Sequence, residues 1–204
     1  MNRILEGSFF AGVILTTTLV RAADAVPLSV RIYNYAEVPE SVLATAQAEA
    51  IRIFLQAGIE VTWLPCAGSD EEFAKSPHKF SDCAQATGAV ILRIEPKSLD
   101  GQAVSKHSWL AAAQSQRAEV FYDRLRQFAA DQDCKPASML ALVMAHELGH
   151  LLLRGESHSS HGIMVPKFRT QELRCAQKGE LLFTPAQAQR MRDFQNLFLT
   201  LGRP

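Results

Sequence analysis

The stretch His146-Glu147-Leu148-Gly149-His150 lies within an apolar segment, residues 137–153, and it decides how the rest of the chain is interpreted. Apolar side chains recur through that segment at helical spacing, which predicts a helix. Residues four apart on a helix lie about 6 Å apart along its axis and about 40° apart around it. The imidazoles of His146 and His150 can therefore converge on one point, as a tetrahedral metal ion requires. Glu147 lies beside that point, where its carboxylate can serve a water instead of binding the metal.

Two histidines leave such a site without a third protein ligand, and the segment after the helix offers candidates. His158 is preferred because it forms a Gly-x-x-His spacing with Gly155. Glycine permits the sharp reversal needed after a helix. His161 is the first alternative and Glu172 is the second. A further alternative is that the two later histidines are exposed imidazoles of a polar loop. We therefore predict His146, His150 and His158 as the metal ligands.

The expected metal is Zn²⁺, and the expected chemistry is peptide hydrolysis. A zinc ion held by three histidines lowers the pKa of a water from about 15.7 toward about 7. Glu147, as general base, would accept the proton while the water attacks a peptide carbonyl, and would then pass it to the departing amine. Gly149 is predicted to let another element approach the helix. The alternative is a non-catalytic exported protein with a structural or decayed zinc site, which would need no base at position 147.

The segment from His146 to Met164 resembles the zinc-binding signature of the metzincins, in which His-Glu-x-x-His-x-x-Gly-x-x-His precedes a turn that carries a methionine. The resemblance implies that the first two histidines are ligands, that the glutamate is the base and that Met164 is the turn methionine. Gly155 and His158 stand two residues later than the signature places them. The gap from His158 to Met164 is also shorter than in the family.

Most of the chain is also similar to uncharacterised exported bacterial proteins that share a His-Glu-Leu-Gly-His-Leu-Leu-Leu core. The other matching segments are residues 33–35, 120–124 and 182–185. Together the resemblances imply a zincin-like α/β (α+β) domain. Such a domain has a twisted, mixed, mostly parallel sheet, an active-site helix, and a small irregular C-terminal part that ends in a helix.

The residue pattern along the first half of the chain predicts a strand, a helix and a strand. Alternating apolar and polar residues predict strands at 28–33 and 59–63, and apolar spacing predicts a helix over 39–57 that ends at Gly58. Elements joined in this order form a right-handed unit whose two strands are parallel. Residues 65–87 are expected to be a polar loop.

Further strands are predicted at 89–94 and 118–122. The unbroken apolar centre of the first suggests burial on both faces. A short helix over 124–130 should follow, with the Asp123 carboxylate capping its first turn. Residues 103–112 are expected to form an exposed edge strand, along which an extended peptide substrate would lie by strand addition.

The C-terminal part is expected to be mostly loop over residues 169–183 and then helical. Thr184 is a favourable N-cap and Pro185 fits the first turn, so the last helix should begin there. Its apolar stripe is expected to cover the core.

Composition and the N-terminus indicate an exported protein with one domain. The chain has 204 residues and 48% hydrophobic side chains, and its 21 basic and 21 acidic residues give no sign of a nucleic-acid partner. Arg3 precedes an apolar segment at 9–20, and residues 23–25 fit a signal-peptidase site. We therefore expect a signal peptide at 1–25 and a metallopeptidase domain at 26–204. An uncleaved N-terminal anchor is the alternative, because Glu6 opposes the charge of Arg3. The expected product is a secreted or periplasmic monomer with a peptide or protein substrate and no stable membrane partner.

The four cysteines suit an oxidising compartment. Four cysteines allow three pairings, and the preferred one joins Cys66 to Cys83 and Cys134 to Cys175. The first pair is favoured because those two residues bracket one polar segment.

Overall fold

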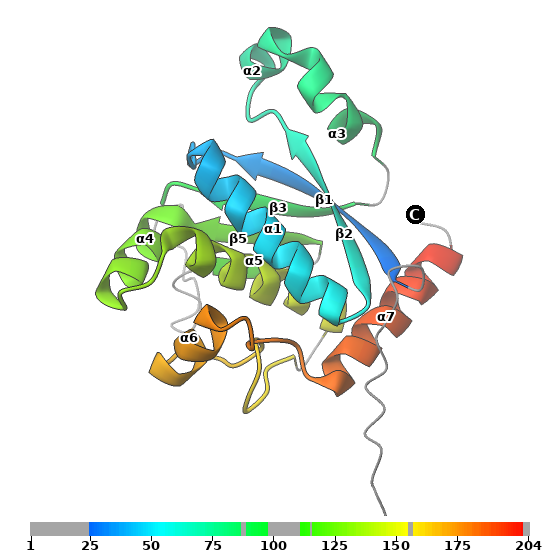
Figure 1. Cartoon of the computed structure of the whole chain (residues 1–204). Helices are drawn as coiled ribbons and strands as arrows, with labels where there is room; N and C mark the ends of the chain where they lie inside the picture. The colour runs from blue at the N-terminus through cyan, green and yellow to red at the C-terminus, as the bar shows by residue number, and fades with distance from the viewer. Residues whose placement is uncertain (1–24, 87–88, 98–110, 115, 155–156, 202–204) are drawn as a thin grey trace, which may run out of the picture.

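The computed structural model describes residues 25–86, 89–97, 111–114, 116–154 and 157–201 (Figure 1). The predicted signal peptide, except its last residue, and most of the predicted edge strand lie outside those ranges. The described strands form one sheet in the order β2-β1-β3-β5-β4. Four of them are parallel and β4 is antiparallel to β5. Their bounds are β1 Val26–Asn34, β2 Ile59–Cys66, β3 Val90–Glu95, β4 Ala111–Gln114 and β5 Arg117–Phe121. The predicted α/β fold with a mixed, mostly parallel sheet is confirmed.

The first three elements form the predicted parallel unit. Helix α1, Glu40–Gln56, connects β1 to β2, whose register pairs Val26 with Ile59. The helix ends as expected at Gly58, whose φ of +74° lies in the left-handed region that glycine adopts without strain. The Gly58 carbonyl then accepts a 2.9 Å hydrogen bond from the Val26 amide, which fixes the start of the sheet.

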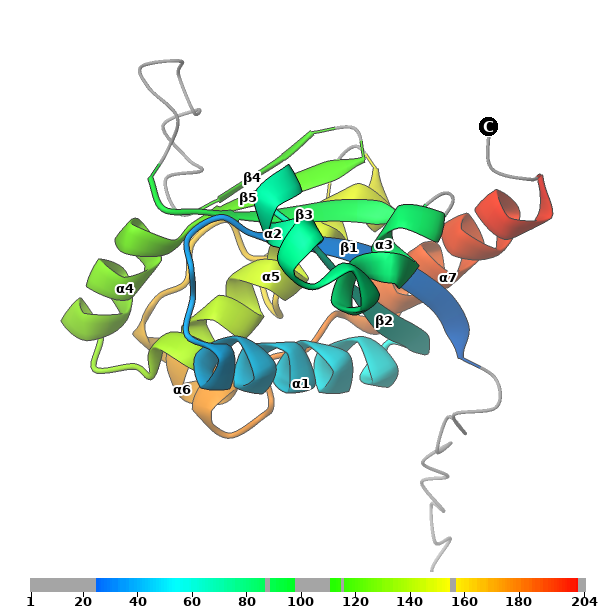
Figure 2. The same cartoon turned by 90° about the horizontal axis from the view of Figure 1, so that it is seen from above.

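Helices α1 and α5, Pro136–Leu153, lie side by side against one face of the sheet (Figures 1 and 2). The strand residues that face these helices are fully buried and form the core with them. They are Leu28, Val30, Ile32, Leu92, Ile94, Ala118 and Val120. Burying one such large apolar side chain contributes about 1.5–3 kcal/mol, so this shared layer is the main stabilisation of the fold.

The opposite face of the sheet is more polar than the sequence suggests. In β3, Leu92 and Ile94 are buried, whereas Ile91 and Arg93 between them are only half-buried. The prediction that β3 is buried on both faces is therefore wrong. Arg93 is accommodated on the outer face because its guanidinium lies 5.6 Å from the Tyr35 ring centroid, within the range of a cation–π interaction.

Residues 65–87, expected to be a loop, instead contain three short helical segments. They are α2 Asp70–Lys75, the 3₁₀ helix η2 Pro77–Phe80 and α3 Ser81–Gln85. The hydroxyl of Ser69 accepts a hydrogen bond from the Glu72 amide and caps α2. Short polar helices have no apolar periodicity, so the pattern alone could not reveal them. We call residues 67–86 the disulfide lobe, and Figure 2 shows its helices over the outer face of the sheet.

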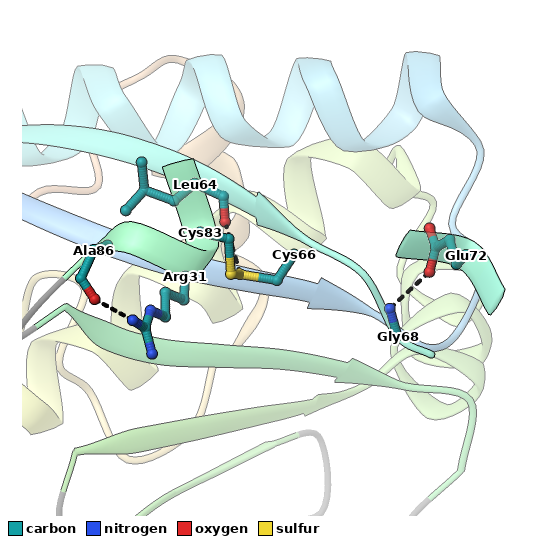
Figure 3. The surroundings of a disulfide bond; sticks show 7 residues. All are labelled: Arg31, Leu64, Cys66, Gly68, Glu72, Cys83 and Ala86. Atoms are coloured by element: carbon teal, nitrogen blue, oxygen red, sulfur yellow. Dashed lines mark hydrogen bonds between the residues drawn. A yellow bond between two sulfur atoms is a disulfide. The ribbon is translucent and has the colours of Figure 1, made fainter. Parts of the chain in front are cut away.

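A disulfide and a hydrogen bond join the disulfide lobe to the sheet (Figure 3). Cys66, the last residue of β2, forms a disulfide with Cys83 in α3, with a Cα–Cα distance of 5.4 Å. Arg31 on β1 donates a hydrogen bond to the Ala86 carbonyl. The first predicted cysteine pair is therefore confirmed. The second is wrong, because Cys134 carries a free thiol.

Helix α4, Tyr122–Asp131, begins directly after β5, two residues earlier than predicted. Asp123 does not cap it: the N-cap residue is Phe121, and no side chain caps the helix. The backbone amide of Asp123 donates instead to the Pro96 carbonyl at 3.2 Å, which ties the start of α4 to the end of β3. The carboxylate remains in the first turn, where a negative charge favours the helix dipole.

The C-terminal part contains one more helix than expected. Residues Thr170–Gln177 form α6, so the prediction of mostly loop over 169–183 is wrong there. The last helix, α7, Pro185–Thr200, begins as predicted, and Thr184 and Gln187 form a reciprocal capping box. Helix α7 packs against α5 and β1 (Figure 1).

Helix α5 is the one helix of the described residues that is long and apolar enough to cross a membrane, judged by length and composition alone. It is 78% buried within the protein. A helix that is apolar on all sides and buried in this way is typical of a protein core.

Candidate metal centre

The site is built on the C-terminal half of α5, which carries His146, Glu147 and His150. Burial decreases outward across the three histidines: His146 is buried, His150 is half-buried and His158, on the following turn, is exposed. The site is thus anchored in the core on one side and open to solvent on the other.

The structure brings His158 next to the two helix histidines. The ring centroids of His146 and His150 lie 4.7 Å apart, and that of His158 lies 5.5 Å and 4.8 Å from them. Each ring offers one nitrogen, and these three nitrogens all lie within 4.8 Å of one another. Three imidazoles arranged in this way can hold one metal ion.

Each helix histidine is oriented by a hydrogen bond from its other ring nitrogen. Nδ1 of His146 lies 2.8 Å from the Ile163 carbonyl oxygen, which can only accept, so this nitrogen carries the proton. Nδ1 of His150 lies 2.5 Å from the Ser157 hydroxyl oxygen. Both Nε2 atoms therefore point into the site. A carbonyl or hydroxyl partner of this kind fixes the tautomer and direction of a metal-binding histidine.

The spacing of the two Nε2 atoms fits a zinc ion. They lie 3.0 Å apart. Two nitrogens that are each about 2.0–2.1 Å from a tetrahedral zinc ion lie about 3.3 Å apart. When Nδ1–H of His150 donates to the Ser157 hydroxyl, both Nε2 atoms present lone pairs to each other, an arrangement that a shared cation relieves. The donor set of three neutral imidazoles also suits zinc.

The pKa values of the histidines keep the rings neutral and available as ligands. Burial lowers the pKa of His146 to about 4, partly opposed by its bond to Ile163 and reinforced by the nearby His158. Burial, together with the other two imidazoles, lowers the pKa of His150 to about 3. Burial also lowers the pKa of His158. Metal binding requires unprotonated imidazoles, so these shifts favour it near neutral pH.

Glu147 is a buried carboxyl group beside the histidines, with 7% of its surface exposed. Burial raises its pKa to about 8. A buried carboxyl group without a cationic partner is costly to a fold, and such groups occur where chemistry uses them.

The turn that follows the histidines packs closely against α5. A Cβ on Gly149 would lie 2.6 Å from the Met164 sulfur and 2.8 Å from Cε1 of Phe183. The prediction that this glycine allows a close approach is confirmed. Gly162 has a φ of +79° and turns the chain before Met164. The Ile163 amide donates a 2.9 Å hydrogen bond to the Leu182 carbonyl. These contacts hold the Ile163 carbonyl within hydrogen-bond distance of His146 Nδ1.

The two alternatives for the third ligand lie away from the group. His161 is exposed, and its Nδ1 lies 3.2 Å from the Ser160 hydroxyl. Glu172 lies on α6, where its carboxylate accepts a 2.8 Å hydrogen bond from the Arg169 amide. Gly155, expected to make the reversal, lies outside the described residues, and Arg154 at the end of α5 already has φ of 43°.

Three contributors were not predicted from the sequence: Ser157, Phe168 and Gln187. The Phe168 ring lies edge-on to His146 with centroids 5.6 Å apart. Gln187 donates to the segment that carries His158. Neither Phe nor Gln is a usual zinc ligand, and both residues come from other parts of the chain, so no sequence signal marks them.

A cavity of about 410 Å³ opens beside the segment that carries His158 and Met164. Its walls combine small polar, apolar and charged side chains. They are Ser159, Ser160, Val165, Pro166, Lys167, Arg169 and Glu172.

No protein-family model matches the chain, and no curated protein matches it. Among solved structures, a zinc-dependent peptidase from Methanocorpusculum labreanum (strain Z) is similar, with a TM-score of 0.52 and 15% identity. The match covers 79% of this chain and 99% of that one. An archaemetzincin from Methanopyrus kandleri matches with a TM-score of 0.47 and 14% identity, covering 87% of this chain and 99% of the other. The first similarity shows a shared fold.

Proposed function

We propose that the protein is a zinc-dependent endopeptidase, with His146, His150 and His158 as metal ligands and Glu147 as general base. The observation that carries the proposal is the buried carboxyl group of Glu147 beside three converging, neutral imidazoles. The similar structure from Methanocorpusculum labreanum is described as a zinc-dependent peptidase, which supports the same assignment.

The roles of the chain's own residues follow from their positions. A bound zinc ion supplies Lewis acidity, which acidifies water and polarises a peptide carbonyl. Glu147 receives a proton on its carboxylate and later delivers it to the departing amine nitrogen. Burial raises its pKa in the metal-free chain, and the positive charge of a bound metal ion would favour the carboxylate form that accepts the proton. Ile163 and Ser157 keep the first two imidazoles directed into the site.

We propose that the substrate lies along β4, the antiparallel edge strand of the sheet. Helix α5 packs beneath β4 as well as β5, so a peptide added to that edge would run close to the histidines. The predicted edge strand, 103–112, shares only residues 111 and 112 with β4. The 410 Å³ cavity would then receive a substrate side chain. If a substrate side chain enters this cavity, Lys167→Glu should change the charge preference there. In a peptide library, cleavage at bonds followed by an acidic residue should decrease relative to cleavage at bonds followed by a basic residue.

We also propose that the protein acts outside the cytoplasm, as a monomer without a stable membrane partner. The Cys66–Cys83 disulfide supports this location, because disulfides persist mainly in oxidising compartments. Cell fractionation with detection of the processed N-terminus tests the signal peptide at 1–25.

The deciding experiment combines zinc stoichiometry with cleavage of a mixed peptide library by wild type and Glu147→Ala. One zinc per chain and cleavage that depends on Glu147 are expected. Stoichiometric zinc without Glu147-dependent cleavage would leave the alternative, a non-catalytic zinc protein. Loss of zinc in His161→Ala but not in His158→Ala would overturn the assigned third ligand.

A further inference from the structure

Helix α7 contacts the residues on both sides of His158. The side-chain nitrogen of Gln187 donates to the Ser157 carbonyl at 3.1 Å and to the Ser159 hydroxyl at 3.0 Å. These two residues flank the histidine directly. One amide group therefore holds the backbone before the histidine and the side chain after it.

Gln187 is itself held rigidly. Its side-chain oxygen accepts a hydrogen bond from the Thr184 backbone amide at 3.0 Å. Its backbone amide donates to the Thr184 hydroxyl. Only 6% of its surface is exposed. Both amide hydrogens and the oxygen are engaged, so the side chain has one available orientation.

A second residue of α7 holds the beginning of the same turn. Arg190 donates to the Leu153 carbonyl at 2.9 Å and lies 3.5 Å from the Arg154 carbonyl, at the end of α5. Those carbonyls have no partner within α5, as at any helix C-terminus. Gln187 and Arg190 thus fasten the two ends of the connection between the second and third histidines.

We infer that α7 positions the third metal ligand, with Gln187 as the main positioning residue and Arg190 as a second. The inference rests on the proposed metal site. His158 is exposed and lies on an irregular turn, so its own surroundings do little to orient it. The connection is two residues longer than the signature it resembles, and a longer turn has more conformations to exclude. The contacts from α7 exclude them before the metal binds.

The first test is the zinc affinity of Gln187→Ala, measured by competition with a chromophoric chelator. Residues that orient ligands change metal affinity by about 10–100-fold when replaced, so a loss in that range is expected. Gln187→Glu gives a second variant that preserves size and the acceptor for Thr184. It replaces the donor with a carboxylate oxygen that faces the Ser157 carbonyl oxygen, which can only accept, so it should also lose affinity.

The decisive test is a double-mutant cycle with His158→Ala. If Gln187 acts through His158, Gln187→Ala should lower zinc affinity in the wild-type background and leave it unchanged in the His158→Ala background. An equal loss in both backgrounds would overturn the inference, as would no loss in either.

Gln195→Ala is the matched control. Gln195 is also a buried amide of α7, but it donates to the Pro27 carbonyl on β1, away from the turn. Its replacement should lower the melting temperature without lowering zinc affinity. Equal losses of zinc affinity in Gln187→Ala and Gln195→Ala would mean that α7 acts only through general stability. That result would overturn the inference. The readout is metal binding, so absence of peptidase activity would defeat the proposed function alone. Absence of zinc binding by the wild type would defeat both.

Discussion

Met164 packs so closely against Gly149 that position 149 has no room for a side chain. A Cβ there would lie 2.6 Å from the methionine sulfur. The contact joins the turn after the histidines to the helix that carries two of them. The methionine is fully buried, so it forms part of the floor beneath the site. The resemblance to the metzincins implied a methionine turn, and the packing shows what Gly149 contributes to it.

Gly149→Ala should lower the melting temperature, because the added methyl group overlaps both Met164 and Phe183. Overpacking of this kind costs about 1–3 kcal/mol. In an unhindered helix interior the same substitution stabilises by about 1 kcal/mol, so the sign of the change is diagnostic. Thermal unfolding followed by circular dichroism measures it.

The double variant Gly149→Ala/Met164→Ala separates this contact from a general helix effect. Removing the methionine relieves the shorter of the two overlaps, so the destabilisations of the two single variants should sum to more than that of the double variant. Strict additivity would contradict the packing explanation.

Ser157→Ala should weaken zinc binding by about 10-fold or more, because the hydroxyl beside His150 orients a ligand. Chelator competition measures the affinity, and the visible spectrum of the cobalt-substituted protein reports the ligand geometry. Ser160→Ala, on an exposed neighbour whose hydroxyl lies near His161, is the control and should leave both unchanged. Equal affinity for Ser157→Ala and wild type would show that the hydroxyl does not orient His150.

Replacing both Cys66 and Cys83 by alanine should destabilise the protein by about 3 kcal/mol, as expected for a disulfide that closes a loop of this size. The two residues are 17 apart in the sequence. Urea unfolding measures the change, and Cys134→Ala is the control because that thiol is free. Zinc affinity should be unaffected, since the disulfide lobe lies on the outer face of the sheet and α5 on the other. Loss of zinc would contradict this separation.

Glu95→Gln should raise the melting temperature at neutral pH and have no effect near pH 3. Burial raises the pKa of Glu95; Arg93 and Arg117 oppose the shift and Glu119 reinforces it. The unfolded chain therefore ionises first, and stability falls as the pH rises from the ordinary pKa of 4.5 through the higher folded value. Glutamine keeps the shape and removes this loss.

Unfolding temperatures of wild type and Glu95→Gln between pH 3 and pH 8 test this expectation. Glu60→Gln, at an exposed position of β2, controls for the loss of one negative charge. A gain at pH 3 as large as that at pH 7 would indicate that ionisation of Glu95 is not the cause.

The elements predicted well from the sequence are those with a strong periodic pattern. The helix ending at Gly58 and the helix over 137–153 match the structure to within two residues. Helices α2, α3 and α6 were not predicted because they are short, so each contains too few apolar residues to show a helical period. Such helices form where a cap, a disulfide or a neighbouring surface stabilises them, and none of these is a periodic signal.

The sequence by itself determined the local part of the site. The helical repeat places His146 and His150 on one face with Glu147 beside them, whatever the rest of the chain does. Alternation of strands and helices determined the mostly parallel sheet in the same way. Both conclusions depend on residues close together in the sequence, where backbone geometry allows few arrangements.

Only the tertiary structure decided which later residue joins the pair. His158 and His161 are equivalent as residue types, and their positions depend on how the chain returns after α5. That return is held by Gln187, whose bond to the Ser157 carbonyl spans 30 residues, and by the contact of Met164 with Gly149. Long-range contacts of this kind depend on how whole elements pack, so residue spacing cannot specify them.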